Sequence, residues 1–347
     1  MCKNIELSLS DYSYELPEEL IAQTPLEKRD ASRLLVLRRG GQTEHKRFSE
    51  LPGMLRPGEV LAVNESRVIP ARIFGKKEGG GSALYEFVLL ERLAGGEWET
   101  LCRPGRRVRA GDAFSFGDGS LRCEITGVRE GGTRIASFSS DGEFFAALER
   151  VGTVPLPPYI KEKLGDAERY QTVYAREKGS VAAPTAGLHF TPALLDELRR
   201  EGVIIAPITL HVGLGTFRPV KEAVITSHKM HEESYYISPE TAAAVNAARA
   251  EGRRVVSVGT TSCRALEASA RADGLVHAGS GRTDLFIYPG FEFKAIDSLI
   301  TNFHLPGSTL LMLTSALAGR ERVLAAYREA VGLRYRFFSF GDAMFIE

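Results

Sequence analysis

The chain has 347 residues, of which 44% are hydrophobic and 25% are charged, and it is long enough for two globular domains. Lys and Arg number 44 together, as do Asp and Glu, so no global field attracts nucleic acid or membrane, and any polyanion site must come from local clusters. The four cysteines form no CxxC pair and no run of 18 apolar residues occurs, so we expect a cytoplasmic protein without a disulfide scaffold or membrane span.

Residues 1–158 predict two kinds of structure. A short helix at 18–22 and strands at 34–37 and 60–63 come first, followed by a polar turn that carries Arg67. From residue 68 to 152 the sequence alternates apolar and polar residues in short runs between Gly-rich turns, and a short helix closes the segment. This pattern is typical of a small antiparallel barrel or sandwich, with a linker at 152–158.

Residues 181–220 form the next unit, a short helix and an apolar strand between two polar loops. Thr191 followed by Pro192 is a strong helix start, and Gly202 ends that helix. Residues 203–212 then read as a buried strand, because they are few and rich in β-branched side chains. His189 and His211 therefore lie on either side of one helix-strand unit.

The remainder of the chain alternates helices and strands. We expect helices at 239–251, 263–272, 309–317 and 320–331, and strands at 254–258, 285–288, 299–303 and 335–346. Such alternation predicts a mostly parallel sheet with helices on its faces.

Polar loops follow several of these strands. Gly259, Thr260, Thr261 and Ser262 follow a buried strand and could offer N–H groups and hydroxyls to an anion, although a tight turn with capping hydroxyls explains them equally well. The segment 301–308 repeats this arrangement with Asn302 and His304. Because ligands of open α/β sheets bind beyond the carboxyl ends of the strands, these loops together with His189 and His211 indicate a shared site.

Other features have two readings each. Cys263 could be an activated thiolate at a helix start, but a buried packing role is favoured because no base is near it in sequence. His228 and His231 could bind a metal, but hydrogen-bonding histidines are favoured because no third ligand can be identified. Basic clusters at 66–77 and 103–109 fit either phosphate contact or a solvated barrel rim.

Nine motifs in order closely resemble the S-adenosylmethionine:tRNA ribosyltransferase-isomerase family of the queuosine pathway, across nearly the whole chain. They are NESRVIPAR (64–72), YQTVYA (170–175), AAPTAGLHFT (182–191), TLHVGLGTF (209–217), HKMHEE (228–233), VGTTSCRALE (258–267), TDLFIYPGF (283–291), TNFHLPGSTLLMLTSALAG (301–319) and YRFFSFGDAMFI (335–346).

The resemblance implies a three-layer α/β domain made of residues 1–67 and 153–347, with a β-barrel domain of residues 68–152 inserted in it. It also implies transfer and isomerisation of the ribosyl part of S-adenosylmethionine onto 7-aminomethyl-7-deazaguanine at the tRNA wobble position. Adenine and methionine are then released. S-adenosylmethionine would be a consumed co-substrate, and we expect no further cofactor, no metal, no membrane partner and a monomer.

Within the matching motifs the resemblance suggests roles. Because the sulfonium acidifies the C5′ proton, the site needs a base, and His211 or His189 is expected there. The methionine carboxylate or ribose hydroxyls would be held by the 259–262 loop, with Asn302 and His304 as further substrate contacts. The remaining assignments are adenine or sulfonium contacts at Phe190 and Phe217, and tRNA phosphate contacts at Arg67, Arg72, Arg106 and Arg107.

Two other functions stay open. A conventional S-adenosylmethionine methyltransferase is disfavoured because no Gly-rich fingerprint follows an N-terminal strand. A non-catalytic RNA-binding barrel protein would use the α/β half only as scaffold. The chain departs from the family at Cys263, where an apolar residue is common, and at 78–84, which is looser than the usual start of the barrel.

Overall fold

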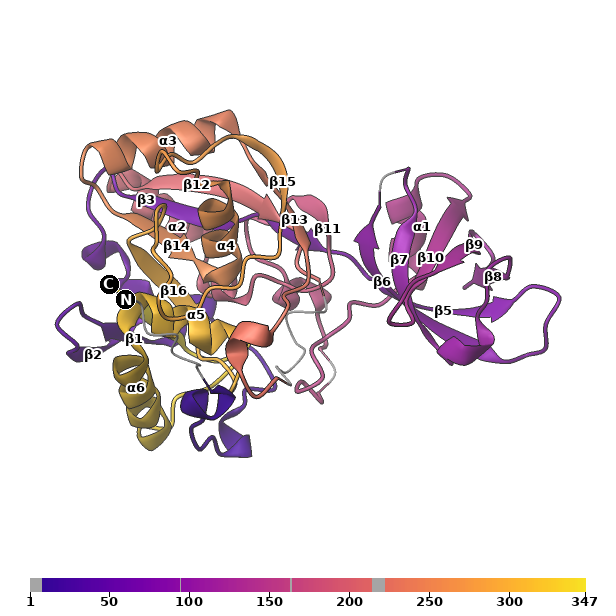
Figure 1. Ribbon diagram of the computed structural model, residues 1–347, viewed down its shortest axis with the longest axis horizontal. Helices are drawn as coiled ribbons and strands as arrows, with labels where there is room; N and C mark the ends of the chain where they lie inside the picture. The colour runs from indigo at the N-terminus through magenta and orange to yellow at the C-terminus, as the bar shows by residue number, and fades with distance from the viewer. Residues whose placement is uncertain (1–7, 94, 163, 214–221) are drawn as a thin grey trace.

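The computed structural model describes residues 8–93, 95–162, 164–213 and 222–347. Figure 1 shows an α/β body that carries the carboxyl end of the chain, with a barrel beside it. The helices are α1 (Phe144–Val151), α2 (Pro192–Arg200), α3 (Pro239–Ala250), α4 (Gly259–Ser269), α5 (Thr309–Ala318) and α6 (Arg320–Gly332). No helix of the described segments is long and apolar enough to cross a membrane.

A sheet of nine strands organises the α/β body, in the order β15-β13-β12-β3-β14-β16-β17-β1-β2. Its strands are β1 (Arg33–Leu37), β2 (Thr43–Arg47), β3 (Val60–Asn64), β12 (Ile204–Leu210), β13 (Glu233–Ile237), β14 (Val255–Val258), β15 (Gly279–Thr283), β16 (Ser298–Asn302) and β17 (Ala343–Ile346). The four central strands, β12, β3, β14 and β16, are mutually parallel, and β17 pairs with β1 in parallel. The other pairs are antiparallel.

Helices cover both faces of this sheet, which makes three layers. Ala62 and its neighbours on one face pack with α3 to α6 in the larger core cluster. Leu61 and Val63 point to the opposite face, where they pack with α2 and with the 3-10 turns η4 (Phe48–Glu50) and η8 (Thr185–His189). Successive residues of a strand alternate between faces, so the continuous apolar run at 60–63 is explained by burial on both sides.

The barrel is closed by six antiparallel strands in the order β10-β7-β6-β5-β8-β9. These are β5 (Arg72–Lys77), β6 (Leu84–Arg92), β7 (Trp98–Arg103), β8 (Ala113–Phe116), β9 (Leu121–Val128) and β10 (Arg134–Ser140). Ala147 and Leu148 of α1 join the barrel core. Closure leaves no unpaired sheet edge, and the interior is filled with aromatic and aliphatic side chains.

Two ion pairs connect the barrel to the α/β body. Arg282 of β15 pairs with Glu91 of β6 at 2.6 Å, and Lys178 of β11 (Glu177–Ser180) pairs with Glu149 of α1 at 2.8 Å. β11 also pairs in parallel with β4 (Ser66–Val68), the strand that precedes the barrel. An isolated antiparallel bridge joins Arg72, at the start of the barrel, to Thr153, just after α1, so the two chain crossings between the bodies lie close together.

The predicted fold class, an α/β sandwich with an inserted small barrel, is confirmed, while the predicted domain limits stay a prediction. The sheet is mixed rather than mostly parallel, because β13, β15, β2 and β17 add antiparallel pairs around the parallel centre. The predicted strand at 285–288 is wrong: those residues have no regular structure, and the strand is β15, just before them. Strands β2 and β13 were not predicted, because their mostly polar residues form no apolar run.

Candidate functional site

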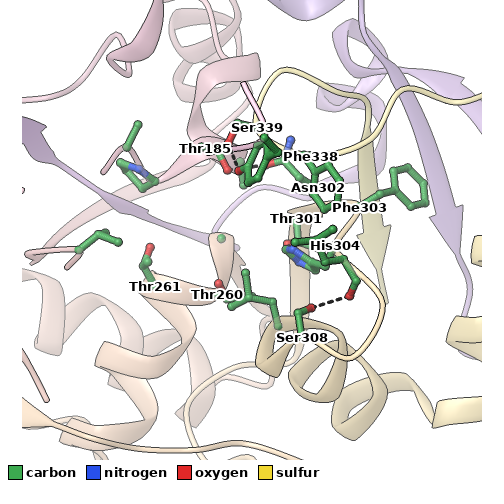
Figure 2. Close-up of a pocket in the computed structure, with 18 of the residues that line it drawn as sticks. Thr185, Thr260, Thr261, Thr301, Asn302, Phe303, His304, Ser308, Phe338 and Ser339 are labelled. Atoms are coloured by element: carbon green, nitrogen blue, oxygen red, sulfur yellow. Dashed lines mark hydrogen bonds between the residues drawn. The ribbon is translucent and has the colours of Figure 1, made fainter. Parts of the chain in front are cut away.

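A cavity of about 200 Å³ opens beyond the carboxyl ends of the central parallel strands. Gly259, Thr260 and Thr261 follow β14, Val212 follows β12, and Thr301 and Asn302 end β16. Other lining residues come from η8, from the segment 303–310, and from Phe338 and Ser339. Figure 2 shows Thr260, Thr301, Asn302 and His304 around this space. The location agrees with the general position of ligand sites in open α/β sheets.

The amino end of α4 forms one wall of the cavity. Gly259 has φ +85°, a left-handed conformation that only glycine adopts without strain, and it turns the chain from β14 directly into the helix. The helix therefore begins at Gly259 and not at the predicted Cys263. Within the described part of the chain no side chain caps it, and its first N–H groups have no intrahelical partners. An uncapped helix start suits an anion such as a carboxylate.

The hydroxyls of this helix start point in different directions. Thr260 and Thr261 line the cavity, and Asn64 of β3 holds Thr261 by donating from Nδ2 to Oγ1 at 3.3 Å. Ser262 is fully buried and donates to the Val258 carbonyl at 2.9 Å, so it does not line the cavity. Cys263 is also fully buried, and burial raises the pKa of its thiol well above the usual value, which fits packing and not nucleophilic chemistry.

His304 lines the cavity with its backbone fixed on both sides. Its N–H donates to the Tyr327 hydroxyl at 3.1 Å, and its carbonyl accepts from the Tyr14 hydroxyl. Nε2 lies 2.7 Å from the Thr301 hydroxyl oxygen. Burial lowers the pKa of His304 to about 3, so the imidazole is neutral at physiological pH.

His189 lies behind the cavity wall and does not line the cavity. Its Nδ1 lies 2.8 Å from Ser32 Oγ, and its Nε2 lies 3.1 Å from Asn302 Nδ2. Its ring stacks on Phe48, with 4.9 Å between ring centroids. Burial, followed by the nearby guanidinium groups of Arg336 and Arg29, lowers the pKa of His189 to about 3. Both ring nitrogens are thus occupied in a neutral ring.

His211 directly follows β12 but does not line this cavity. It lines a hollow of about 210 Å³ between the barrel and the α/β body, together with Glu91, Lys178 and Glu232. Its Nδ1 is buried and has no hydrogen-bond partner among the described residues, and burial lowers the pKa of His211 while Glu177 and Glu91 oppose the shift. The structure therefore does not bring His211, His189 and His304 together around one cavity.

The aromatic residues of the cavity differ from those expected. Phe190 is completely buried and packs edge-on against Phe48, away from the cavity, and Phe217 lies outside the described residues. Phe338 lines the cavity instead, with its ring stacked on Tyr159 at 4.8 Å. The backbone of Phe338 has φ +68°, an unfavourable conformation for a bulky residue. No local sequence pattern predicts that its side chain lines the cavity.

The predicted tRNA-binding arginines fall into two groups. Arg67 pairs with Glu168, and Arg72 lies 3.1 Å from Glu86, so both have carboxylate neighbours. Arg106 and Arg107 are exposed in the turn η6 (Gly105–Arg107) of the barrel.

The buried side chain of Arg134 is hydrogen-bonded to the backbone of that turn. Arg134 donates to the carbonyls of Gly105 and Val108, the latter at 3.0 Å. It thereby ties β10 to the backbone on both sides of Arg106 and Arg107.

The His228 segment shows hydrogen bonding. His228 Nδ1 lies 2.9 Å from a Glu222 carboxylate oxygen, and its ring meets Phe286 edge-on. Within the described residues, no group of three or more His, Cys, Asp or Glu side chains is placed to hold a metal ion.

The chain is similar to known proteins over nearly its whole length. A family model described as a queuosine biosynthesis protein matches residues 9–346. An S-adenosylmethionine:tRNA ribosyltransferase-isomerase of Moorella thermoacetica is 62% identical over 342 residues, covering 98% of this chain and 100% of that protein. The protein of the same name from Symbiobacterium thermophilum is 59% identical over 341 residues, with the same coverage. A solved structure of S-adenosylmethionine tRNA ribosyltransferase from Thermotoga maritima matches with 42% identity, a TM-score of 0.57, and coverage of 97% and 100%.

Proposed function

The chain belongs to the queuosine biosynthesis protein family, and we propose that the cavity at the amino end of α4 is where it binds S-adenosylmethionine. The enzyme transfers and isomerises the ribosyl moiety of S-adenosylmethionine onto 7-aminomethyl-7-deazaguanine at the tRNA wobble position. The product is epoxyqueuosine-tRNA, and adenine and methionine leave. S-adenosylmethionine is thus a co-substrate.

The observation that carries the placement is the uncapped start of α4 in the cavity wall. The free N–H groups of Gly259, Thr260 and Thr261 bind the methionine carboxylate, helped by the positive end of the helix dipole. The threonine hydroxyls add hydrogen bonds to the same end of the ligand. This assignment directs the sulfonium and the ribose toward Asn302 and His304.

The proton at C5′ is removed by His304 in this proposal. His304 lines the cavity, which the two histidines predicted from the sequence do not. When Nε2 of His304 donates its proton to the Thr301 hydroxyl, the Nδ1 lone pair is free to accept the C5′ proton. The prediction that His211 or His189 is the base stays untested. His211 retains a free lone pair, but it lies toward the barrel junction.

Arg106 and Arg107 bind phosphates of the tRNA in this proposal, because both are exposed and no carboxylate of the described residues pairs with either. Arg67 and Arg72 already have carboxylate neighbours, so they contribute less to phosphate binding. We further propose that the enzyme acts as a cytoplasmic monomer without another cofactor.

The products of one reaction test this function. The protein is incubated with S-adenosylmethionine and tRNA that carries 7-aminomethyl-7-deazaguanine, and the small molecules are separated. Free adenine and methionine, with the ribosyl group on the tRNA, are expected. S-adenosylhomocysteine would indicate a methyltransferase, and tRNA binding without turnover would indicate a binding protein. A preference for tRNA that lacks the modified base would also contradict the proposal.

A further inference from the structure

Four buried or half-buried side chains form one hydrogen-bond chain that ends at the cavity. Ser32 Oγ donates to the Arg29 carbonyl at 3.4 Å and lies 2.8 Å from His189 Nδ1. His189 Nε2 lies 3.1 Å from Asn302 Nδ2. Asn302 Oδ1 then accepts from the Thr185 hydroxyl at 2.9 Å. Ser32, His189 and Asn302 are each at most 4% exposed, while Asn302 and Thr185 line the cavity.

The hydrogen-bond chain has a fixed direction because an amide nitrogen can only donate. Asn302 Nδ2 therefore donates to the lone pair of His189 Nε2 at 3.1 Å. The proton of the neutral ring is then on Nδ1 and is donated to the Ser32 oxygen at 2.8 Å, while the Ser32 hydroxyl hydrogen faces the Arg29 carbonyl at 3.4 Å.

The consequence at the cavity is an oriented amide. Because Nδ2 of Asn302 faces His189, its Oδ1 faces Thr185, and the Thr185 hydroxyl donates its hydrogen to that oxygen. The lone pairs left on Thr185 Oγ1 are therefore available only as acceptors. Rotation of the Asn302 amide would break the contacts to both His189 and Thr185, and breaking buried hydrogen bonds is costly.

We propose that this hydrogen-bond chain makes Thr185 and Asn302 an acceptor wall, a cavity surface that offers only hydrogen-bond acceptors and so selects a hydrogen-bond donor of S-adenosylmethionine. His189 is the positioning residue that fixes the direction of the hydrogen bonds. This inference rests on the proposed function of the cavity. The donor is either the amino group of adenine or a ribose hydroxyl, since both are neutral and carry a hydrogen.

The position of the wall fits this role. In Figure 2, Thr185 and Asn302 lie beside Phe338 and Ser339, on the side of the cavity away from Thr260 and Ser308. The carboxylate end of the ligand is assigned to the start of α4. The nucleoside end is then the part that reaches the acceptor wall, next to an aromatic ring.

A pair of substitutions at His189 separates polarity from packing. Glutamine can place its amide oxygen near the position of Nε2 and accept from Asn302, whereas asparagine reaches only the position of Nδ1 and contacts only Ser32. We expect His189→Gln to bind S-adenosylmethionine within about threefold of the unchanged protein, and His189→Asn to bind it about tenfold more weakly. Calorimetry without tRNA measures both. Equal affinities of the two folded variants would overturn the inference.

The tautomer provides a test in the unchanged protein. Nitrogen NMR of histidine-labelled enzyme, with the His189 signals assigned by their loss in His189→Gln, should show Nδ1 protonated and Nε2 unprotonated at pH 7. The opposite tautomer, or a charged ring, would overturn the proposed direction. This measurement does not depend on whether the His189→Asn variant folds.

Ligand analogues identify the donor. One analogue carries an oxo group in place of the adenine amino group, and two others lack the 2′ or the 3′ hydroxyl. The unchanged enzyme should bind one of them at least tenfold more weakly than S-adenosylmethionine, and Thr185→Val should lose most of that discrimination. If Thr185→Val discriminates like the unchanged enzyme for all three, the acceptor wall is refuted. If the unchanged protein binds no S-adenosylmethionine at all, the proposed function itself fails.

Discussion

His189 and His304 are two buried histidines whose environments keep them neutral for different purposes. His189 uses both nitrogens inside the protein, whereas His304 has one nitrogen bound to Thr301 and lines the cavity. The same residue type therefore serves positioning in one place and, in our proposal, proton transfer in the other. The number of internal hydrogen bonds distinguishes the two roles.

These two histidines should make the folded state sensitive to mild acid. Burial lowers both pKa values from 6.5 to about 3. Between these values the unfolded chain binds a proton at each histidine that the folded chain does not. The free energy of unfolding should therefore fall as the pH falls from 6.5 toward 3, by up to about 1.4 kcal/mol per pH unit for each histidine.

Urea unfolding at several pH values between 7 and 5 measures this dependence. His189→Gln and His304→Gln should each reduce the slope below pH 6.5, because glutamine does not titrate. Unchanged slopes in both variants would show that these histidines do not set the acid sensitivity.

Ligands of open α/β sheets bind beyond the carboxyl ends of the strands, and this tendency alone predicted from the sequence that Thr260, Thr261, Asn302 and His304 share one site. Thr185 and Phe338 could not be found in this way. Thr185 belongs to a 3-10 turn, and Phe338 reaches the cavity only through a left-handed backbone conformation held by the surrounding fold. Tertiary contacts, not local patterns, bring them there.

Helix α4 and the turn before it connect the sheet to the cavity. The sequence predicted its start four residues late, because glycine is a poor helix former and two threonines follow it. Strand β14 is followed directly by α4, because the positive φ of Gly259 turns the chain there. Thr260, Thr261 and Ser262 therefore lie in the first helical turn. The predicted polar loop is therefore a helix start, which strengthens the case for anion binding.

Two glycines with similar backbone angles provide a matched test at this level. Gly259 has φ +85°, and Gly252, which follows α3, has φ +70°. Among the described residues, a Cβ atom added at Gly252 would meet no atom within 4 Å, and one added at Gly259 would come no closer than 3.6 Å to its neighbours. Alanine at either position should lower the free energy of unfolding by about 1 kcal/mol or more, because the left-handed conformation becomes strained.

Only Gly259→Ala should also weaken binding of S-adenosylmethionine, by about tenfold, because it disturbs the N–H groups of α4. Chemical denaturation and calorimetry on the same preparations separate the two effects. A similar loss of affinity in Gly252→Ala would mean that stability, and not the helix start, controls binding.

At the scale of the whole molecule, the barrel and the α/β body were both predictable from the sequence, because their periodicities differ. Short alternating runs indicate an antiparallel barrel, and long helix-strand alternation indicates a layered sheet. The order of the strands was not predictable. β13 and β15 pair through polar or glycine-containing residues, so no apolar run marks them as strands.

The barrel should contribute to tRNA binding mainly through Arg106 and Arg107. Replacing both by alanine should weaken tRNA binding and reduce the slope of log affinity against log salt concentration by about 2, since each phosphate contact releases about one counterion. Arg129, which pairs with Glu99 at 2.7 Å on the same barrel, is the matched control. A slope that changes equally in Arg129→Ala would refute a specific role of the η6 turn.

Proton removal at C5′ inside the cavity is the central claim, and release of tritium tests it directly. S-adenosylmethionine labelled with tritium at C5′ is incubated with precursor tRNA and enzyme, and tritium in water is counted. The unchanged enzyme should release tritium with turnover, His304→Gln should release it at least 100-fold more slowly, and His211→Gln should remain within about tenfold of the unchanged rate. Full release by His304→Gln together with loss in His211→Gln would contradict the account and move the base to the barrel junction.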